Sequence, residues 1–279
     1  MATVLSPEDA AQLRNFERQR HDVLAEGYIG FFAPVTALAI SPLLEAVRLG
    51  PGMHLLDVPT GSGALAAEAS RRGASVIGVD ISSGMIAQAR KRHAGIEFRI
   101  ADVEHLPVAD AVLDAVVCAF GLGHFPYPEI AVAECMRTLK PGGRIAFTWW
   151  DASDRQRVQG LIRDAVAEVG AKPPGVLPAS HSSMRFTNLG EFRRLLEGAG
   201  LVDIAIEEHG ATHLVPDVDA LWNGALSGMP LTSSLIVFQD ASTQAAIRAA
   251  LERKAVAYKT ARGLELPIAF RVGAGRKPN

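Results

Sequence analysis

The chain has 279 residues, enough for one large α/β domain with additions or for two modest domains. Its 28 lysines and arginines nearly balance 30 aspartates and glutamates, for a formal net charge of -2. Because phosphate binding normally requires a basic patch, this balance argues against nucleic acid as a partner.

The first expected element is a polar helix over residues 1–21. Ser6 provides a cap, Pro7 suits the first helical position, and acidic residues follow in the first turn. The most apolar early stretch, residues 31–40, is only about ten residues long, well short of the roughly 20 needed to span a bilayer. We therefore expect neither a signal peptide nor membrane insertion.

The two cysteines, Cys118 and Cys135, lie in an expected strand and an expected helix. They lack the short spacing of a metal site or a redox pair, which favours buried thiols in a reducing compartment. Together with the expected lack of a leader peptide, this predicts a cytoplasmic protein.

Short β-branched runs alternate with amphipathic helical patterns between residues 51 and 150. The expected strands are 53–58, 75–79, 97–101, 111–120 and 144–150. This alternation is typical of βαβ units, so the sequence predicts a doubly wound, mostly parallel sheet with helices on both faces. We expect this part to be the cofactor-binding core.

The pattern changes after residue 150. We expect helices over 155–169 and 189–199, a loop over 172–183, a strand over 202–207, a helical region over 218–260 broken near residues 229–230, and a last strand over 266–271. Residues 1–50 and the helical insertions within 151–279 are expected to form an α-helical cap over the carboxyl ends of the strands, where ligands of open α/β folds bind.

The first chemically informative segment is the turn after the first strand, which has the sequence Pro59-Thr60-Gly61-Ser62-Gly63. Its glycines would let a ligand approach the backbone at the amino end of a helix. The same turn satisfies a relaxed dinucleotide fingerprint, with an acid about 20 residues further on. Two cofactors therefore remain open at this point.

Acidic residues at three successive strand ends separate the two cofactors. Asp57 ends the first strand and would repel a pyrophosphate, but it would attract the ammonium and sulfonium of S-adenosylmethionine. Asp80 is placed to accept hydrogen bonds from ribose hydroxyls, and Asp102 from an adenine amino group. The acids favour S-adenosylmethionine.

With these motifs, residues 53–150 resemble the class I S-adenosylmethionine-dependent methyltransferases, particularly the group that contains the ubiquinone and menaquinone biosynthesis C-methyltransferases. The resemblance implies a Rossmann-like, seven-stranded sheet. It places Asp57, Gly61 and Gly63 beside the methionine part, and Phe120 near it. It further implies cofactor contacts from the rest of the glycine turn and from the next two strand ends: Pro59, Thr60, Ser62, Asp80, Ile81, Met85, Asp102 and Val103.

Pro59 departs from the family pattern, which usually has glycine or another small residue there. Proline fixes φ and removes a hydrogen-bond donor. The departure leaves open whether the methionine end is held in the usual way, and we interpret Pro59 as a rigid turn rather than a specialised functional residue.

Aromatic residues and one histidine are candidates for contact with a methyl acceptor. Tyr28, Phe32, Trp149 and Trp150 are expected at the entrance face, where they would form an apolar pocket or ordinary packing between cap and core. His124 follows the fourth strand and could act as a general base; a structural histidine in a loop is the alternative. No residue pattern implies a metal.

The sequence therefore predicts an enzyme that transfers the methyl group of S-adenosylmethionine to carbon, oxygen or nitrogen of a small, fairly apolar metabolite, leaving S-adenosylhomocysteine. A dinucleotide-dependent oxidoreductase is one alternative. A second is a protein that binds the cofactor without methylating anything.

Overall fold

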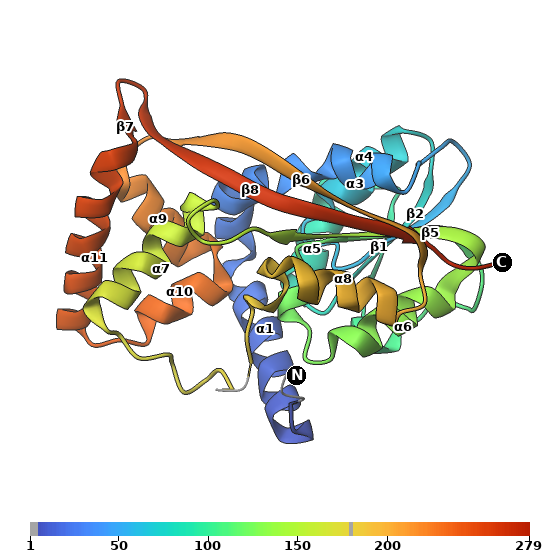
Figure 1. Ribbon diagram of the computed structural model, residues 1–279, viewed down its shortest axis with the longest axis horizontal. Helices are drawn as coiled ribbons and strands as arrows, with labels where there is room; N and C mark the ends of the chain where they lie inside the picture. Colours follow the sequence, from blue (N-terminus) through green and yellow to red (C-terminus); the bar gives the residue numbers. More distant parts are fainter. Residues whose placement is uncertain (1–4, 179–180) are drawn as a thin grey trace.

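A computed structural model describes residues 5–178 and 181–279 (Figure 1). Residues 1–4 of the expected first helix and residues 179–180 of the expected loop lie outside the described residues. Within them, an α/β core carries a group of helices at one end, beside the carboxyl ends of the parallel strands.

The central sheet confirms the predicted strand architecture. Its order is β3-β2-β1-β4-β5-β8-β6, with the first five strands parallel and β8 antiparallel to both of its neighbours. A short strand, β7, pairs only with β8. The strands are β1 His54–Asp57, β2 Ser75–Asp80, β3 Glu97–Ile100, β4 Leu113–Ala119, β5 Leu139–Trp150, β6 Val202–Val215, β7 Lys259–Thr260 and β8 Gly263–Arg276.

The last two long strands extend further than their sequence suggested. We expected strands over 202–207 and 266–271, whereas β6 and β8 each have 14 residues and pair from Val202 to Val215. Figure 1 shows them reaching from the core sheet to the helical end of the molecule. Half of β6 is exposed because it is an edge strand, so its outer residues carry no apolar pattern from which its length could be predicted.

Helices cover both faces of the core sheet and form the cap. Figure 1 shows α3 and α4 on one side of the sheet and α6 and α8 on the other. The α-helices are α1 Pro7–Gly27, α2 Ala33–Thr36, α3 Ile40–Ala46, α4 Ala64–Arg71, α5 Ser83–Arg92, α6 Pro128–Thr138, α7 Arg157–Val169, α8 Leu189–Gly198, α9 Val218–Gly228, α10 Pro230–Val237 and α11 Ala241–Ala255.

Local chemistry sets several helix boundaries as expected. The Ser6 hydroxyl accepts a hydrogen bond from the Asp9 amide at 3.1 Å, and Pro7 starts α1. Pro230 separates α9 from α10 at the predicted break. Cys118 and Cys135 are both buried free thiols, as predicted.

The helical run Pro7–Ala46 is long and apolar enough to cross a membrane by length and composition, with a mean hydropathy of 1.7 over its most apolar 18 residues. In this fold several of its apolar side chains pack in the core or line a cavity. Phe32, Val35 and Leu43 belong to the main core cluster, while Tyr28, Thr36 and other neighbours line a cavity. Of the apolar window, 22% is buried.

Candidate functional site

A cavity of about 180 Å³ lies where the parallel strands meet the helical cap. This volume exceeds the roughly 10–15 Å³ that one buried water needs by an order of magnitude, so the cavity is a ligand-sized space rather than a packing defect. The ends of β1, β2, β4 and β5 supply its floor, and α1, α7 and the start of α10 supply other walls. This is the edge at which open α/β sheets bind ligands.

The structure brings nearly all the predicted site residues to this one cavity. Gly63 does not belong to this lining, and its contact with the cofactor stays a prediction. Gly63 instead begins α4 with a left-handed φ of 82°, and an added Cβ would come within 2.9 Å of His93 and Phe98. The predicted residues that do line the cavity are Tyr28, Phe32, Asp57, Pro59, Thr60, Gly61, Ser62, Asp80, Ile81, Met85, Asp102, Val103, Phe120, His124, Trp149 and Trp150.

Asp57 is fully buried and only half satisfied. Its Oδ2 accepts a 2.7 Å hydrogen bond from the Thr60 hydroxyl, whereas its Oδ1 has no partner at hydrogen-bond distance among the described residues. The backbone amide of Ala66 also interacts with the carboxylate and lowers the pKa of Asp57, against the effect of burial. Burial, reinforced by the nearby charge of Asp80, raises the pKa of Asp57 to about 7. A buried carboxylate oxygen without a donor fits a cationic group of a ligand and would repel a phosphate.

Asp80 fastens the glycine turn to the end of β2. One carboxylate oxygen accepts from the Gly61 amide at 2.8 Å, and the other accepts from the Ser82 amide at 2.9 Å. Burial raises the pKa of Asp80, and these hydrogen bonds oppose the rise. Each oxygen keeps a second lone pair, so the carboxylate can still accept from ligand hydroxyls.

Asp102 has a partner that its sequence position did not reveal. Its Oδ2 forms a 2.9 Å ion pair with Arg14 of α1, and its Oδ1 accepts from the Glu104 amide. Arg14 also pairs with the buried carboxylate of Glu104 and lies over the Tyr127 ring. The adenine end of the expected cofactor site is therefore closed by a charged group of the N-terminal helix.

An aromatic stack forms another part of the wall. The Phe120 and Trp150 rings are stacked with centroids 3.7 Å apart, and Phe32 packs on Trp150 at 5.6 Å. Phe120 has a φ of 55°, unusual for a residue with a side chain, and this conformation turns the chain at the end of β4. Trp150 therefore combines the two roles considered for it, as a wall of the cavity and as packing between cap and core.

Pro59 is part of the turn and faces the cavity. The Val58–Pro59 peptide bond is cis, and the proline ring lies so close to Gly121 that an added Cβ there would approach Pro59 Cδ to 2.4 Å. This packing agrees with the interpretation of Pro59 as a rigid turn.

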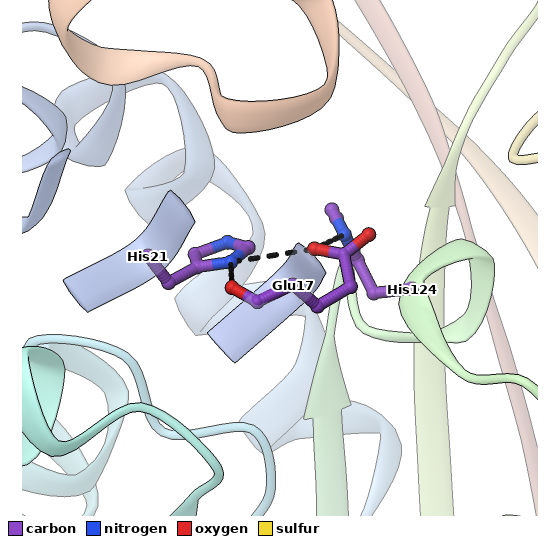
Figure 2. A group of neighbouring side chains, drawn as sticks. All are labelled: Glu17, His21 and His124. Carbon is purple, nitrogen blue, oxygen red and sulfur yellow. Dashed lines mark hydrogen bonds and ion pairs between the residues drawn. The ribbon is translucent and has the colours of Figure 1, made fainter. Parts of the chain in front are cut away.

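A buried carboxylate joins two histidines inside the cavity (Figure 2). Glu17 of α1 places its Oε2 3.0 Å from Nδ1 of His124 and 3.3 Å from Nδ1 of His21. Burial alone would raise the pKa of Glu17, but the charge and hydrogen bonds of the two histidines outweigh it and lower the pKa to about 2. Glu17 is therefore ionised throughout the physiological range.

The ionised carboxylate fixes the tautomer of His124. An ionised carboxylate only accepts hydrogen bonds, so His124 donates through Nδ1–H and its Nε2 is left as the proton acceptor in the neutral ring. His21 Nδ1 also lies 2.8 Å from the Glu17 carbonyl oxygen, which again requires a donor. The hydrogen bonds and charge of Glu17 outweigh burial and raise the pKa of His21.

The same three side chains could geometrically hold a metal ion, since one ligand atom from each lies within 4.8 Å of the others. The hydrogen bonds already account for this clustering, because both Nδ1 atoms face Glu17 at hydrogen-bond distance. The metal-free interpretation of the sequence stays a prediction.

Sequence reasoning missed the contribution of α1 and α7 to the cavity. Arg14, Glu17 and His21 have the spacing i, i+3, i+7, which puts them on one face of a helix. Gln159 and Arg163 are likewise one turn apart on α7. The helical spacing of these polar residues was the available indication, but it does not by itself tell a cavity face from a solvated face.

Comparison with known sequences gives a direct family match. Residues 56–147 match the methyltransferase domain family. A demethylmenaquinone methyltransferase of Renibacterium salmoninarum is 37% identical over 37% of this chain and 44% of its own length. A ubiquinone/menaquinone biosynthesis C-methyltransferase of Geobacter sulfurreducens is 30% identical over 58% of this chain and 70% of its own length. The chain thus spans less than half the length of the first of these relatives and about two thirds of the second.

Solved structures share the fold over most of the chain. A structure from Bacillus halodurans superposes with a TM-score of 0.57 at 19% identity, covering 86% of this chain and 99% of that one. A phosphoethanolamine N-methyltransferase of Haemonchus contortus, in complex with S-adenosylhomocysteine, gives a TM-score of 0.51 at 18% identity and covers 86% of this chain and 52% of that one. From the sequence relatives, the strand order and the cavity at the strand ends, the chain belongs to the class I S-adenosylmethionine-dependent methyltransferases.

Proposed function

We propose that this chain binds S-adenosylmethionine in the cavity at the strand ends and transfers its methyl group to a small, largely apolar metabolite. The observation that carries the proposal is the buried, half-satisfied carboxylate of Asp57 beside the glycine turn. This carboxylate favours a cationic group at the position where a dinucleotide would place its pyrophosphate.

The residues at the strand ends fit the parts of this cofactor. Asp57 Oδ1 would accept from the ammonium of the methionine part, Asp80 from the ribose hydroxyls, and Asp102 with Val103 would border the adenine. Gly61 leaves open space where any side chain would begin, since an added Cβ would meet no atom within 4 Å. When bound, the cofactor supplies an electrophilic methyl group on a sulfonium.

The protein's own residues would orient the acceptor, exclude water from the reacting groups and provide a proton acceptor. Aromatic walls from Tyr28, Phe32 and Trp149 would hold an apolar acceptor and exclude water, which makes an in-line displacement effectively intramolecular. His124 Nε2 would take the proton that leaves a hydroxyl or an acidic carbon. Glu17 accepts the Nδ1–H hydrogen bond and so holds the neutral ring in the tautomer whose Nε2 carries no proton.

The two alternatives differ from the proposal in the ligand or in the product. A dinucleotide oxidoreductase would have to accommodate a doubly negative pyrophosphate beside Asp57 and Asp80, both buried. A protein that binds the cofactor without methylating would keep the cation site and yield no S-adenosylhomocysteine with any acceptor. Cofactor binding and product analysis therefore separate all three functions.

Affinity for the cofactor should rise with pH through the titration of Asp57. Because burial raises its pKa to about 7, the carboxyl of the empty protein is protonated below about pH 7, whereas an ordinary aspartate is ionised above about pH 4. In that range an ammonium ligand must displace the proton. We expect S-adenosylhomocysteine to bind on the order of tenfold more tightly at pH 8 than at pH 5.5. Calorimetry should show proton release on binding near pH 6, and Asp57→Asn should abolish the release; a wild-type affinity that is independent of pH would contradict this role.

The acceptor wall should respond separately from the cofactor site. Tyr28 donates or accepts a 2.9 Å hydrogen bond with Thr36, and burial raises its pKa to about 12, so it presents a neutral hydroxyl to the cavity. Tyr28→Phe and Phe32→Ala should raise the Michaelis constant of the acceptor while cofactor affinity stays within about twofold. Trp150→Ala should also lower the melting temperature, because that ring stacks on Phe120. Equal losses for acceptor and cofactor would assign these residues to packing.

Metal removal should leave the activity unchanged. The Glu17, His21 and His124 cluster is held together by hydrogen bonds, so catalysis should survive dialysis against EDTA with the same turnover number. A loss of activity that zinc or another divalent ion restores would show instead that these three residues hold a metal.

A further inference from the structure

Several polar atoms of the cavity lining have no hydrogen-bond partner. Among the described residues that line it, Asp57 Oδ1 and Glu17 Oε1 are acceptors without a donor. The buried donors without a hydrogen-bond acceptor are Arg14 Nε, Trp149 Nε1 and Arg163 Nε, and of these Arg14 is ion-paired with Asp102. The two acceptors belong to the proposed cofactor and base positions, but nothing in the proposed reaction uses Arg163.

Arg163 is an unusual arginine because it has no anion to pair with. It lies in the middle of α7, and no hydrogen bond or ion pair links it to any other described residue. Burial lowers the pKa of its guanidinium, and no neighbouring carboxylate opposes that shift. Other arginines of the cap are paired, such as Arg157 with Asp164 and Arg253 with Glu168. A desolvated guanidinium without a counter-charge is costly, so its place in a ligand cavity indicates a ligand anion.

The amino end of α10 faces the same cavity. Met229, Pro230, Leu231 and Thr232 line it, and α10 packs against α7. No side chain caps this helix, and the amides of Leu231 and Thr232 have no acceptor within the described part of the chain. Free amides and the positive end of the helix dipole favour an anion there.

We propose that the acceptor carries an oxyanion, a carboxylate or a phosphate, that binds Arg163 and the uncapped amino end of α10. This inference rests on the proposed function and deepens it, because it names the chemical class of the acceptor: an apolar body with one anionic group. Gln159, one turn before Arg163 on the same face, adds a neutral donor beside the anion. The anion would also balance the cationic cofactor across the cavity.

The test uses the full chain loaded with S-adenosylhomocysteine and three probes with one apolar body: 2-naphthoate, 2-naphthyl phosphate and the neutral 2-naphthamide. By calorimetry, at least one anionic probe should bind about tenfold or more tightly than the amide, as expected for one charge-assisted contact. The better of the two anions identifies the carboxylate or the phosphate as the preferred group. Arg163→Gln should remove the preference and leave affinity for S-adenosylhomocysteine unchanged.

Arg193→Gln is the matched control, because it makes the same charge change on an exposed residue of α8 outside the cavity. It should keep the full preference for the anion. Three results would overturn the inference: equal binding of anion and amide, an equal loss in both variants, or a loss of S-adenosylhomocysteine affinity in Arg163→Gln. The last result would assign Arg163 to the carboxylate of the cofactor. Failure of wild type to bind S-adenosylhomocysteine would contradict the proposed function, whereas the probe preference is also measurable without it.

Stability gives a readout that needs no acceptor. Since Arg163 is half-buried and its buried Nε has no partner among the described residues, Arg163→Gln should melt at the same temperature as wild type or higher when no ligand is present. The anionic probe should raise the melting temperature of wild type and of Arg193→Gln, but not of Arg163→Gln. A clearly lower melting temperature for unliganded Arg163→Gln would show an internal partner and overturn the inference.

Discussion

Replacing His124 with glutamine should lower the turnover number by about 10²–10⁴ on an acceptor whose proton must leave, with cofactor affinity unchanged. A phenol-like hydroxyl is mostly protonated at neutral pH, and the Nε2 of a neutral His124 is a free proton acceptor in the site. The residual activity should rise with pH toward the pKa of the acceptor, because hydroxide then replaces the imidazole. Steady-state kinetics between pH 6 and pH 10 check both statements.

Glu17→Gln separates a positioning role from a structural one. Glutamine keeps the size of the side chain but loses the charge that makes Glu17 an obligate acceptor for His124 Nδ1–H. We expect an intermediate loss in turnover, about 10–100-fold, with little change in either Michaelis constant. His105→Gln, an exposed histidine, is the control and should match wild type. A His124→Gln enzyme within about threefold of wild type at pH 7 would return His124 to a structural role and leave catalysis to proximity.

Asp80→Ala should weaken S-adenosylhomocysteine binding by roughly 1.5–3 kcal/mol. The loss has two sources, since the carboxylate would accept from the ribose and already holds the Gly61 and Ser82 amides in place. Asp80→Asn keeps one acceptor oxygen and should lose less. Calorimetry measures both affinities, and circular dichroism checks that the variants fold.

Asp154→Ala is a suitable control for the loss of one acidic residue, because Asp154 is exposed and lies outside the cavity. It should bind the ligand like wild type. A folded Asp80→Ala with wild-type affinity would show that the carboxylate does not contact the cofactor.

The core of the fold was predictable because its physical causes are local. Each parallel strand is a short buried run, and each following helix has a periodic apolar face, so the alternation over residues 51–150 specifies βαβ units. The acids Asp57 and Asp80 were found for the same reason, since each ends a strand and parallel strands end at one edge. The length of β6 was not, because an edge strand carries little apolar pattern. The length of β8 was missed with it, because the extra residues of β8 pair with the extended part of β6.

The cap side of the site depended on tertiary contacts that no local pattern contains. Glu17 lies 107 residues from its partner His124, and Arg14 lies 90 residues from Glu104. On a helical wheel these polar residues look the same whether they face water or a cavity. Arg163 shows the converse: its importance lies in a missing partner, which only the packed structure reveals.

Calorimetric titration of the purified chain with S-adenosylhomocysteine and, separately, with NADH tests the central claim most directly. We expect one S-adenosylhomocysteine per chain, bound more tightly as the pH rises toward 8, and no measurable binding of NADH, because Asp57 and Asp80 disfavour a pyrophosphate. Saturable binding of NADH together with no binding of S-adenosylhomocysteine would contradict the account.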